Sequence, residues 1–345
     1  MILWLAPMDG FTDLAMRFIT ADIFSRYGEH EKYSLWLRTE FMTADGYKAR
    51  PRGVMQHLLT LPCTTPTIAQ IFWGNLETLL FTAREIQEKY AQIFSGIELN
   101  MGCPANNIMR SGWGSELLKD KKNALDIIQA LSQQAKLPLS IKTRTGINED
   151  DKEAQMEMLV KASAYCSIIS IHGRTTKQGY GGDPDWKFVY ELKRKADKKC
   201  KIIGNGAMHS YEDIEAMKWN LDGIMIGQSA IGNPWIFTPH IPDNEEKKQT
   251  VLEHLDLTIA AFLWYHSQMT EGKETLTMPS REHLDTIRNQ YIKSPGIIPS
   301  RPLTEFRKHL FSYVKWMTGS KERKVMVSQL TDYPTLVQAI QDFFI

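Results

Sequence analysis

Short apolar segments recur along residues 2–226, and this recurrence is the feature that most constrains the fold of the 345-residue chain. Most of the segments are nearly continuous apolar runs, as expected for strands that are buried on both faces of a parallel sheet. Amphipathic helical stretches lie between them, so strand and helix alternate. The eight segments span residues 2–6, 33–37, 67–72, 96–99, 139–143, 167–171, 201–203 and 223–226.

Eight strands, each followed by a helix or a helical loop, predict a (β/α)8 TIM barrel over residues 1–240. The clearest helical patterns cover residues 13–27, 76–90, 115–134, 152–164 and 211–219, and Ser210 with Asp213 forms a capping-box pattern before the last of these. The alternative is a doubly wound open sheet. It would be favoured by a G-x-G-x-x-G motif after the first strand, and the chain has none there.

The composition changes after Asn233-Pro234, and no strand pattern follows. Residues 240–248 are polar and are predicted to be a linker, and residues 270–280 are predicted to be a second loop. Apolar residues at helical spacing over 251–270, 304–316 and 336–344 predict helices. We therefore expect a small all-helical C-terminal domain over residues 241–345.

Polar residues collect where the predicted strands end, which is where a barrel of this kind carries its active site. Polar side chains in apolar strands are informative exceptions, and eight convergent positions are difficult to explain as structural. They are Pro7, Met8 and Asp9 after the first strand, Arg38 and Glu40 after the second, Gln70 in the third, Asn100 to Cys103 after the fourth, Lys142 and Arg144 in the fifth, His172 after the sixth, Asn205 and Gly206 after the seventh, and Gly227 and Gln228 after the eighth.

The last two strands of such a barrel commonly bind phosphate. Gly206 and Gly227 permit a close approach of the backbone, and the helix that starts near Ser210 adds its dipole. A phosphate there, with Lys142 and Gln70 nearby, suits flavin mononucleotide (FMN). Cys103 follows the fourth strand, and a thiol at the barrel mouth is either a nucleophile or a general acid.

The four cysteines, at positions 63, 103, 166 and 200, include no C-x-x-C pair. We therefore expect neither a metal site nor a disulfide framework, and reduced thiols indicate a cytoplasmic protein. The apolar start is too short for a signal segment, and no apolar run is long enough to span a membrane.

Six segments in chain order resemble the tRNA-dihydrouridine synthases. They are APMDGFTD, ELNMGCPANNIMRSGWGSELLKD, IKTRTG, IHGRTTKQGYGG, IIGNGAM and IMIGQSAIGNPWIF. The helical tail also resembles this family through Phe306-Arg307-Lys308-His309. The resemblance implies an FMN enzyme that reduces the C5–C6 bond of uridine in the tRNA D-loop and is re-reduced by NADPH. It implies hydride transfer from flavin N5 to C6, and protonation of C5 by Cys103.

The resemblance also implies the binding residues. The substrate set is Asn100, Arg144, Glu40, Arg307 and Lys308, with Lys142 beside the uracil. The FMN set is Pro7, Met8, Asp9, Gln70, Lys142, His172, Asn205, Gly206, Ala207, Gly227 and Gln228. Hydride addition builds negative charge on O4 of the ring, which requires cationic or amide donors nearby. A thiol suits the acid role, because an unperturbed thiol keeps its proton near neutral pH.

The sequence departs from the family pattern at two places. Gln228 stands where relatives usually carry Arg beside the phosphate, and Trp113 replaces a small residue in the loop after Cys103. Thr39-Glu40-Phe41 resembles the group that modifies position 16, whereas Gly-Asn-Pro-Trp at 232–235 resembles another group. The modified position is left open.

The formal charge of the whole chain is +1, which by itself argues against a nucleic-acid binder. This value is an average over regions of different charge. Residues 281–324 contain ten Lys or Arg and four acidic residues, a balance of +6, with Tyr313 and Trp316 among them. This segment is expected to contact tRNA phosphates.

Two other functions are alternatives to a tRNA-dihydrouridine synthase. One is an FMN-dependent oxidoreductase of small pyrimidines or enoates, which has no need of such a basic segment. The other is an RNA-binding factor without catalysis. We expect a monomer that binds tRNA and NADPH.

Overall fold

The structure is a computed structural model that describes residues 1–61, 65–72, 74–104, 114–271, 276–315 and 317–345. The chain packs as two compact units. The barrel unit comprises Met1–Met8, His30–Leu58 and Thr65–Gly227, and the helical unit comprises Asp9–Glu29, Leu59–Thr64 and Gln228–Ile345. The sequence analysis divided the chain into a barrel domain over residues 1–240 and a helical domain over residues 241–345. This division stays a prediction.

The barrel unit is a closed, all-parallel sheet of eight strands in sequence order, as predicted. Each strand pairs with its neighbours in the chain, and the first strand pairs with the last. The strands are β1 (Ile2–Leu5), β2 (Ser34–Thr43), β3 (Thr67–Phe72), β4 (Gly96–Asn100), β5 (Leu139–Arg144), β6 (Ile168–His172), β7 (Lys201–Asn205) and β8 (Gly223–Ile226).

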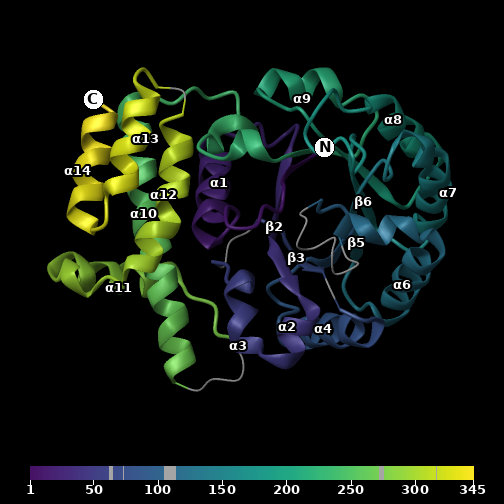
Figure 1. The fold of residues 1–345 in the computed structure, drawn as a ribbon, viewed down its shortest axis with the longest axis horizontal. Helices are drawn as coiled ribbons and strands as arrows, with labels where there is room; N and C mark the ends of the chain where they lie inside the picture. The colour runs from purple at the N-terminus through teal and green to yellow at the C-terminus, as the bar shows by residue number, and fades with distance from the viewer. Residues whose placement is uncertain (62–64, 73, 105–113, 272–275, 316) are drawn as a thin grey trace. The chain divides into compact units, whose positions relative to one another are not determined.

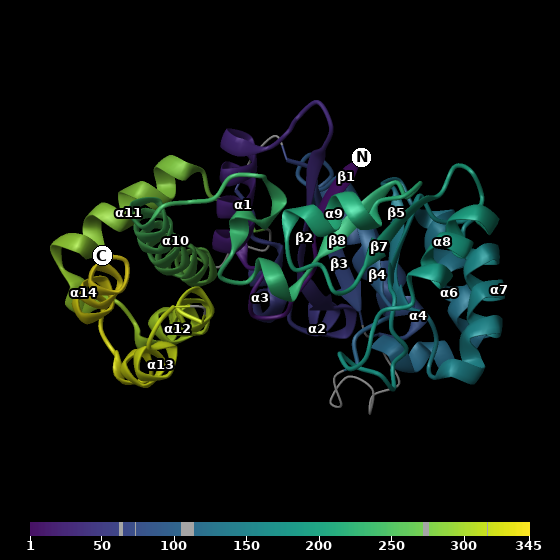
Figure 2. The ribbon, with the colours of Figure 1, turned by 90° about the horizontal axis from the view of Figure 1, so that it is seen from above.

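Helices cover the outside of the barrel (Figure 1). In Figure 2 the strands run through the centre of this unit with α6, α7 and α8 outside them. The helices of this unit are α2 (Ala44–Ala49), α3 (Pro51–Val54), α4 (Leu76–Lys89), α6 (Lys121–Gln134), α7 (Lys152–Ala162), α8 (Trp186–Lys195) and α9 (Tyr211–Met217), with 3-10 turns η1 (Met55–Leu58), η2 (Gly114–Lys119) and η3 (Glu149–Asp151).

The helical unit packs around one long helix, α10, which contacts α1, α11, α12 and α14. Its core includes the fully buried Leu255, Ile259, Phe306 and Ile340. The elements of this unit are α1 (Leu14–Tyr27), η4 (Gln228–Ala230), η5 (Pro234–Phe237), α10 (Asn244–Thr270), α11 (Arg281–Lys293), η6 (Pro295–Ile297), α12 (Ser300–Tyr313), α13 (Ser320–Gln329) and α14 (Tyr333–Phe343). Among the described residues, no helix is both long and apolar enough to cross a membrane.

Most helices begin where a polar side chain accepts a hydrogen bond from a backbone N–H of the first turn, which satisfies a group that the helix leaves unpaired. The predicted capping box of Ser210 and Asp213 is confirmed. The caps of this kind are Asp13, Thr43, Asn75, Asp120, Asp185, Ser210, Asp243, Ser280 and Asp332.

Two sequence expectations about elements were wrong, and two helices were missed. The predicted 240–248 linker already contains the start of α10, because Asp243 caps that helix. The 115–134 helix is interrupted at Asp120, which caps α6. Helices α11 and α13 were not predicted, because few of their residues are buried: Leu284 and Tyr291 in α11, and Val327 in α13.

Candidate active site

The strand register places several of the predicted polar residues side by side on neighbouring strands. Asn100 on β4 is paired with Lys142 on β5, and Arg144 on β5 is paired with His172 on β6. His172 is in turn paired with Asn205 on β7. Because side chains alternate between the two faces of a strand, these residues share one face of the sheet, at the carboxyl ends of four neighbouring strands.

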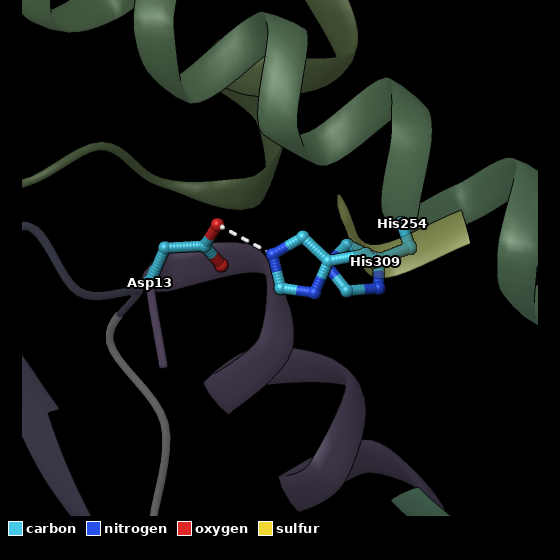
Figure 3. Close-up of side chains that lie close together, drawn as sticks. All are labelled: Asp13, His254 and His309. Carbon is cyan, nitrogen blue, oxygen red and sulfur yellow. Dashed lines mark ion pairs between the residues drawn. The ribbon is translucent and has the colours of Figure 1, made fainter. Parts of the chain in front are cut away.

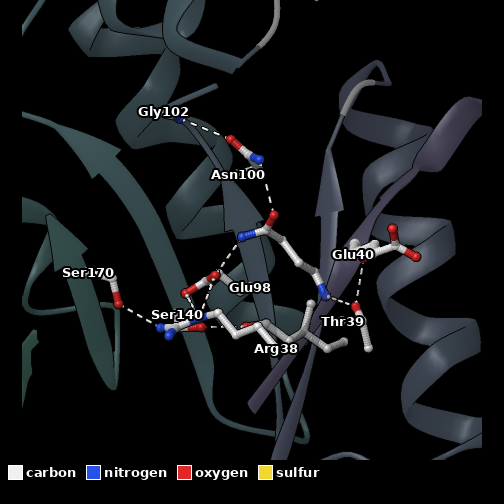
Figure 4. Close-up of polar contacts among 10 residues, drawn as sticks. Arg38, Thr39, Glu40, Glu98, Asn100, Gly102, Ser140 and Ser170 are labelled. Atoms are coloured by element: carbon white, nitrogen blue, oxygen red, sulfur yellow. Dashed lines mark hydrogen bonds and ion pairs between the residues drawn. The ribbon is translucent and has the colours of Figure 1, made fainter. Parts of the chain in front are cut away.

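A chain of buried side chains runs beneath this surface (Figure 4). Arg38 and Glu98 form an ion pair, with Nε 2.7 Å from Oε1 and both side chains fully buried. Glu98 also accepts a hydrogen bond from Nε2 of Gln70 at 2.6 Å, and Nδ2 of Asn100 donates to Oε1 of Gln70 at 3.1 Å. Glu98 therefore fixes the direction of the Gln70 amide, which in turn holds Asn100.

Arg38 is anchored on two further sides. Its Nη2 donates to the Ser170 hydroxyl at 2.6 Å, and its guanidinium lies 4.0 Å from the centre of the Trp4 ring. Burial lowers the pKa of Arg38, and the Glu98 carboxylate opposes this effect. The site is thus built over a buried charge pair that packs on the apolar core of the barrel.

The placement of Arg38 and Glu40 after the second strand was wrong, because β2 continues to Thr43. The register with β3 shifts between Arg38 and Phe41, which is a bulge. The Thr39 hydroxyl accepts the backbone N–H of Gln70 at 3.0 Å, so it replaces a ladder bond that the bulge removes. Glu40 is buried and lies 3.3 Å from the His57 ring.

The turn that carries Cys103 is held from two directions. Oδ1 of Asn100 accepts the backbone N–H groups of Gly102 and Cys103, both at 3.1 Å. Arg144 donates from Nε to the Gly102 carbonyl at 2.8 Å, and Ser115 donates its N–H to the Cys103 carbonyl at 3.0 Å. Glycine is favoured at position 102, since a Cβ there would lie 3.2 Å from the Thr143 backbone, which is a tight contact.

The mouth of the barrel contains two cations, Lys142 and Arg144, and one neutral imidazole, that of His172. Burial, followed by the nearby Arg144 charge, lowers the pKa of Lys142 to about 8, so the ammonium stays mostly protonated at neutral pH. Burial and then Arg144, Lys142 and Arg174 lower the pKa of His172 to about 2, so the imidazole is neutral. Nδ1 of His172 is buried and makes no hydrogen bond among the described residues.

The ends of β7 and β8 have unusual backbone conformations. Gly206 has φ +133° and Ala207 has φ +51°, so two successive residues lie in the region that L side chains avoid. A Cβ on Gly206 would lie 3.0 Å from Pro184 and 3.7 Å from Nε2 of His172. Asn205 donates from Nδ2 to the Met225 carbonyl at 2.8 Å and so links the two strands.

The sequence analysis expected the dipole of the helix that starts near Ser210 to favour a phosphate, and the two backbone amides just before α9 are already paired. The backbone N–H groups of His209 and Ser210 donate to the Asp213 carboxylate, at 2.6 Å and 3.1 Å. The helix itself has only seven residues. The backbone at Gly206, Ala207 and Gly227 remains the candidate for an anion site at this end of the barrel.

The family model described as dihydrouridine synthase (Dus) matches residues 4–344. The chain belongs to the dihydrouridine synthase family. The expected enzyme class, an oxidoreductase that forms dihydrouridine in tRNA, is thereby confirmed.

Three relatives span nearly the whole chain. A probable tRNA-dihydrouridine synthase of Rickettsia conorii is 27% identical, over 99% of this chain and 92% of the relative. The tRNA-dihydrouridine synthase B of Pseudomonas syringae pv. tomato is 26% identical, over 99% and 90%. A probable tRNA-dihydrouridine synthase of Aquifex aeolicus is 28% identical, over 93% and 96%. None of these names states the modified uridine, and the likeness to the position-16 group stays a prediction.

One residue at the mouth of this synthase was missed by the sequence analysis. Tyr180 is 61% exposed, yet its ring lies 5.8 Å from the Arg144 guanidinium and 6.2 Å from the His172 ring. Arg144 also donates to the carbonyls of Thr175 and Gly179, and these two hydrogen bonds hold the loop that carries Tyr180. The signal in the sequence was an aromatic residue within the glycine-rich GYGG stretch after β6.

The basic segment of the synthase, residues 281–324, is partly neutralised within the helical unit. Arg281 pairs with Glu253 at 2.7 Å, and Arg288 pairs with Asp256 at 2.6 Å. Both acids lie on α10, outside the segment, so the sequence balance of +6 overstates the local charge. Arg307 donates to the carbonyls of Ser328 and Leu330 at the end of α13, which is a structural role.

The remaining predicted residues are distributed as follows. Lys308 lies over the Phe11 ring, at 5.6 Å from its centre. Asp9 and Gln228 belong to the helical unit, whereas Pro7 and Met8 belong to the barrel unit. Cys103, Cys166 and Cys200 are free thiols. The predictions on Cys63, Trp113 and Trp316 fall outside the described residues.

Proposed function

We propose that this chain reduces the C5–C6 double bond of a uridine in the tRNA D-loop, in the cytoplasm, with bound FMN and with NADPH as the reductant. The observation that carries the proposal is the convergence of one thiol, two cations and two amides at the carboxyl ends of β3, β4 and β5. Cys103, Lys142, Arg144, Gln70 and Asn100 supply these groups.

The residues present fit FMN. A flavin ring offers N–H and C=O groups along one edge. Asn100 and Lys142 are donors or acceptors for such an edge, whereas Gln70 is fully buried and orients Asn100. His172 is neutral and has a buried Nδ1 without a partner among the described residues, so it can bond a polar ligand atom without adding charge. Gly206 carries no side chain and its φ of +133° suits glycine, so a phosphate could approach the backbone closely there.

FMN, when bound and reduced, supplies the hydride that reaches C6 of the uracil. The residues of the chain handle the charge and the proton. Negative charge that develops on O4 is stabilised by the Lys142 ammonium and by the Arg144 guanidinium. Cys103 then donates its thiol proton to C5, which completes the addition of two hydrogens across the bond. The Asn100 and Arg144 hydrogen bonds hold the Cys103 turn for this transfer.

A uridine inside a folded tRNA must leave its stack to reach this site. Tyr180 offers an exposed aromatic face beside Arg144, and flipped bases commonly stack on such faces. We therefore add Tyr180 to the substrate-binding residues.

The helical unit supports contacts with the tRNA backbone. Lys293, Lys315 and Lys321 are exposed. Cations at such positions attract phosphates independently of sequence. Arg307 was part of the predicted substrate set, and its bonds to the α13 carbonyls favour a role in folding this surface.

The test uses tRNA that lacks dihydrouridine, and compares Cys103→Ala with the wild-type enzyme. We expect Cys103→Ala to retain flavin and to oxidise NADPH, while uridine reduction falls by about 100-fold or more, as for loss of a general acid. Cys103→Ser is the matched control for size, and we expect it to be impaired as well, because a hydroxyl is a much weaker acid. Wild-type rates of uridine reduction in Cys103→Ala would refute the role of the thiol.

A further inference from the structure

Three side chains from distant parts of the sequence meet inside the helical unit (Figure 3). Asp13 precedes α1, His254 lies on α10 and His309 lies on α12. One ligand atom from each lies within 4.8 Å of the others. Both imidazoles are completely buried, whereas the Asp13 side chain is 30% exposed.

Asp13 and His309 form an ion pair, but the separation of their atoms is too long for a hydrogen bond of ordinary length (Figure 3). Nε2 of His309 lies 3.4 Å from Oδ2 of Asp13, and neither ring nitrogen of His309 makes a hydrogen bond within the described part of the chain. Nε2 of His254 is likewise buried there without a partner. Buried polar atoms that lack a partner destabilise a fold by about 1–3 kcal/mol each, so they call for a ligand.

The same distances suit a metal ion. Tetrahedral zinc with bonds of about 2.0–2.1 Å places two of its ligand atoms roughly 3.3 Å apart, close to the Asp13–His309 separation. His254 bonds through Nδ1 to the Tyr313 hydroxyl at 3.1 Å, which leaves Nε2 available as a metal ligand. This is the usual arrangement of a ligating histidine, since its other nitrogen is held by an oxygen.

Asp13 is held in a similar way. Its Oδ1 accepts the Met16 N–H at 2.9 Å as the cap of α1, and Oδ2 faces His309. One carboxylate oxygen of Asp13 therefore caps α1, while the other lies beside His309 in the cluster. The partial exposure of Asp13 also gives an ion a path from solvent.

We propose that Asp13, His254 and His309 bind one Zn²⁺, with a water molecule as the fourth ligand on the exposed side of Asp13. Two imidazoles and one carboxylate suit zinc, whereas Mg²⁺ and Ca²⁺ prefer oxygen ligands throughout. The expectation of no metal site rested on cysteine spacing, which carries no information about histidines so far apart in the chain. The ion would link α1, α10 and α12, so its binding energy stabilises the helical unit.

The experiment titrates Zn²⁺ into untagged, full-length protein from which metals have been removed, against a competing chromophoric chelator. We expect one Zn²⁺ per chain and a higher melting temperature when zinc is present. Asp13→Asn is the central variant, because Asn caps a helix as well as Asp does but removes the charged ligand. We expect its zinc affinity to be at least about tenfold lower while the fold is retained.

Two further variants complete the design. His254→Phe removes a buried ligand, and we expect it to abolish stoichiometric binding. His266→Ala removes an exposed histidine of the same helix and is the matched control, for which we expect wild-type affinity. The proposal is overturned if wild-type protein takes up no stoichiometric zinc, or if Asp13→Asn and His254→Phe bind it as wild type does. These readouts do not involve uridine reduction, so they are independent of the proposed function.

Discussion

Replacement of Arg38 tests whether the buried charge pair under the active site is required for folding. In Arg38→Met the Glu98 carboxylate stays completely buried without its cation. Removal of one partner of a buried pair typically destabilises a protein by about 3–5 kcal/mol, because the other charge is left uncompensated. Since 1 kcal/mol shifts the melting temperature of a unit of this size by about 2–4 °C, we expect a fall of roughly 6–20 °C.

The double variant Arg38→Met/Glu98→Gln separates the charge from the hydrogen bonds. A glutamine at position 98 carries no charge and can still offer an oxygen to Nε2 of Gln70, which keeps the link to Asn100. We expect this variant to recover most of the stability lost in Arg38→Met. The four proteins of the cycle would be compared by thermal and denaturant unfolding at matched flavin occupancy, with a coupling of at least about 2 kcal/mol expected.

The same variants test positioning of the Cys103 turn. In the described part of the chain, Arg38 makes no hydrogen bond to that turn. The hydrogen-bonded route from Arg38 to the turn runs through Glu98, Gln70 and Asn100. The Arg38 and Glu98 charges also act on Lys142. We expect Arg38→Met to lower the rate of uridine reduction, and the double variant to restore part of it. Wild-type stability in Arg38→Met, or strictly additive effects in the cycle, would refute the reasoning.

Three other substitutions probe the mouth and the helical unit. The Lys142 cation is lost as pH rises through its pKa of about 8, so single-turnover uridine reduction should fall over that range, and Lys142→Arg should shift the fall to higher pH; a flat profile in wild type to about pH 9 would contradict this. Tyr180→Ala should lower kcat/KM for tRNA by about 5- to 150-fold, since stacking of a base contributes about 1–3 kcal/mol, whereas Tyr180→Phe should resemble wild type; equal losses in both would remove the stacking role. The charge reversals Lys321→Glu and Lys324→Glu should weaken tRNA binding and reduce its salt dependence by about one unit per lost contact, measured by filter binding, whereas Arg307→Met should mainly lower stability; unchanged salt dependence in the lysine variants would exclude this surface.

The barrel was predictable from the sequence because the same pattern, an apolar strand followed by a helix, is repeated along the chain. Eight apolar runs at regular intervals fix both the number of strands and their parallel order, and seven of the predicted strands lie within two residues of the observed ones at both ends. The end of β2 was missed for a local reason. Arg38 and Glu40 are charged, and a charged residue in a strand is not expected until its partner is known. The partner of Arg38, Glu98, is 60 residues away in sequence and becomes adjacent only when the barrel closes.

The site was predictable to the level of residue types but not of contacts. Family motifs indicated Cys103, Asn100 and Arg144, and strand pairing brought Asn100 beside Lys142. Motifs could not show that Arg307 bonds to backbone carbonyls instead of remaining available to RNA, because this depends on the end of α13. The cluster of Asp13 with two histidines was also invisible, since it depends on the packing of three helices.

The most direct test of the central claim is the dihydrouridine content of tRNA from cells that lack dihydrouridine synthases, measured by mass spectrometry after incubation with the purified protein and NADPH. We predict that one defined D-loop uridine gains two hydrogens, that Cys103→Ala abolishes most of this gain, and that free uridine and small enoates are not reduced. Oxidation of NADPH with no dihydrouridine in the tRNA, together with reduction of a small pyrimidine or enoate, would contradict the account.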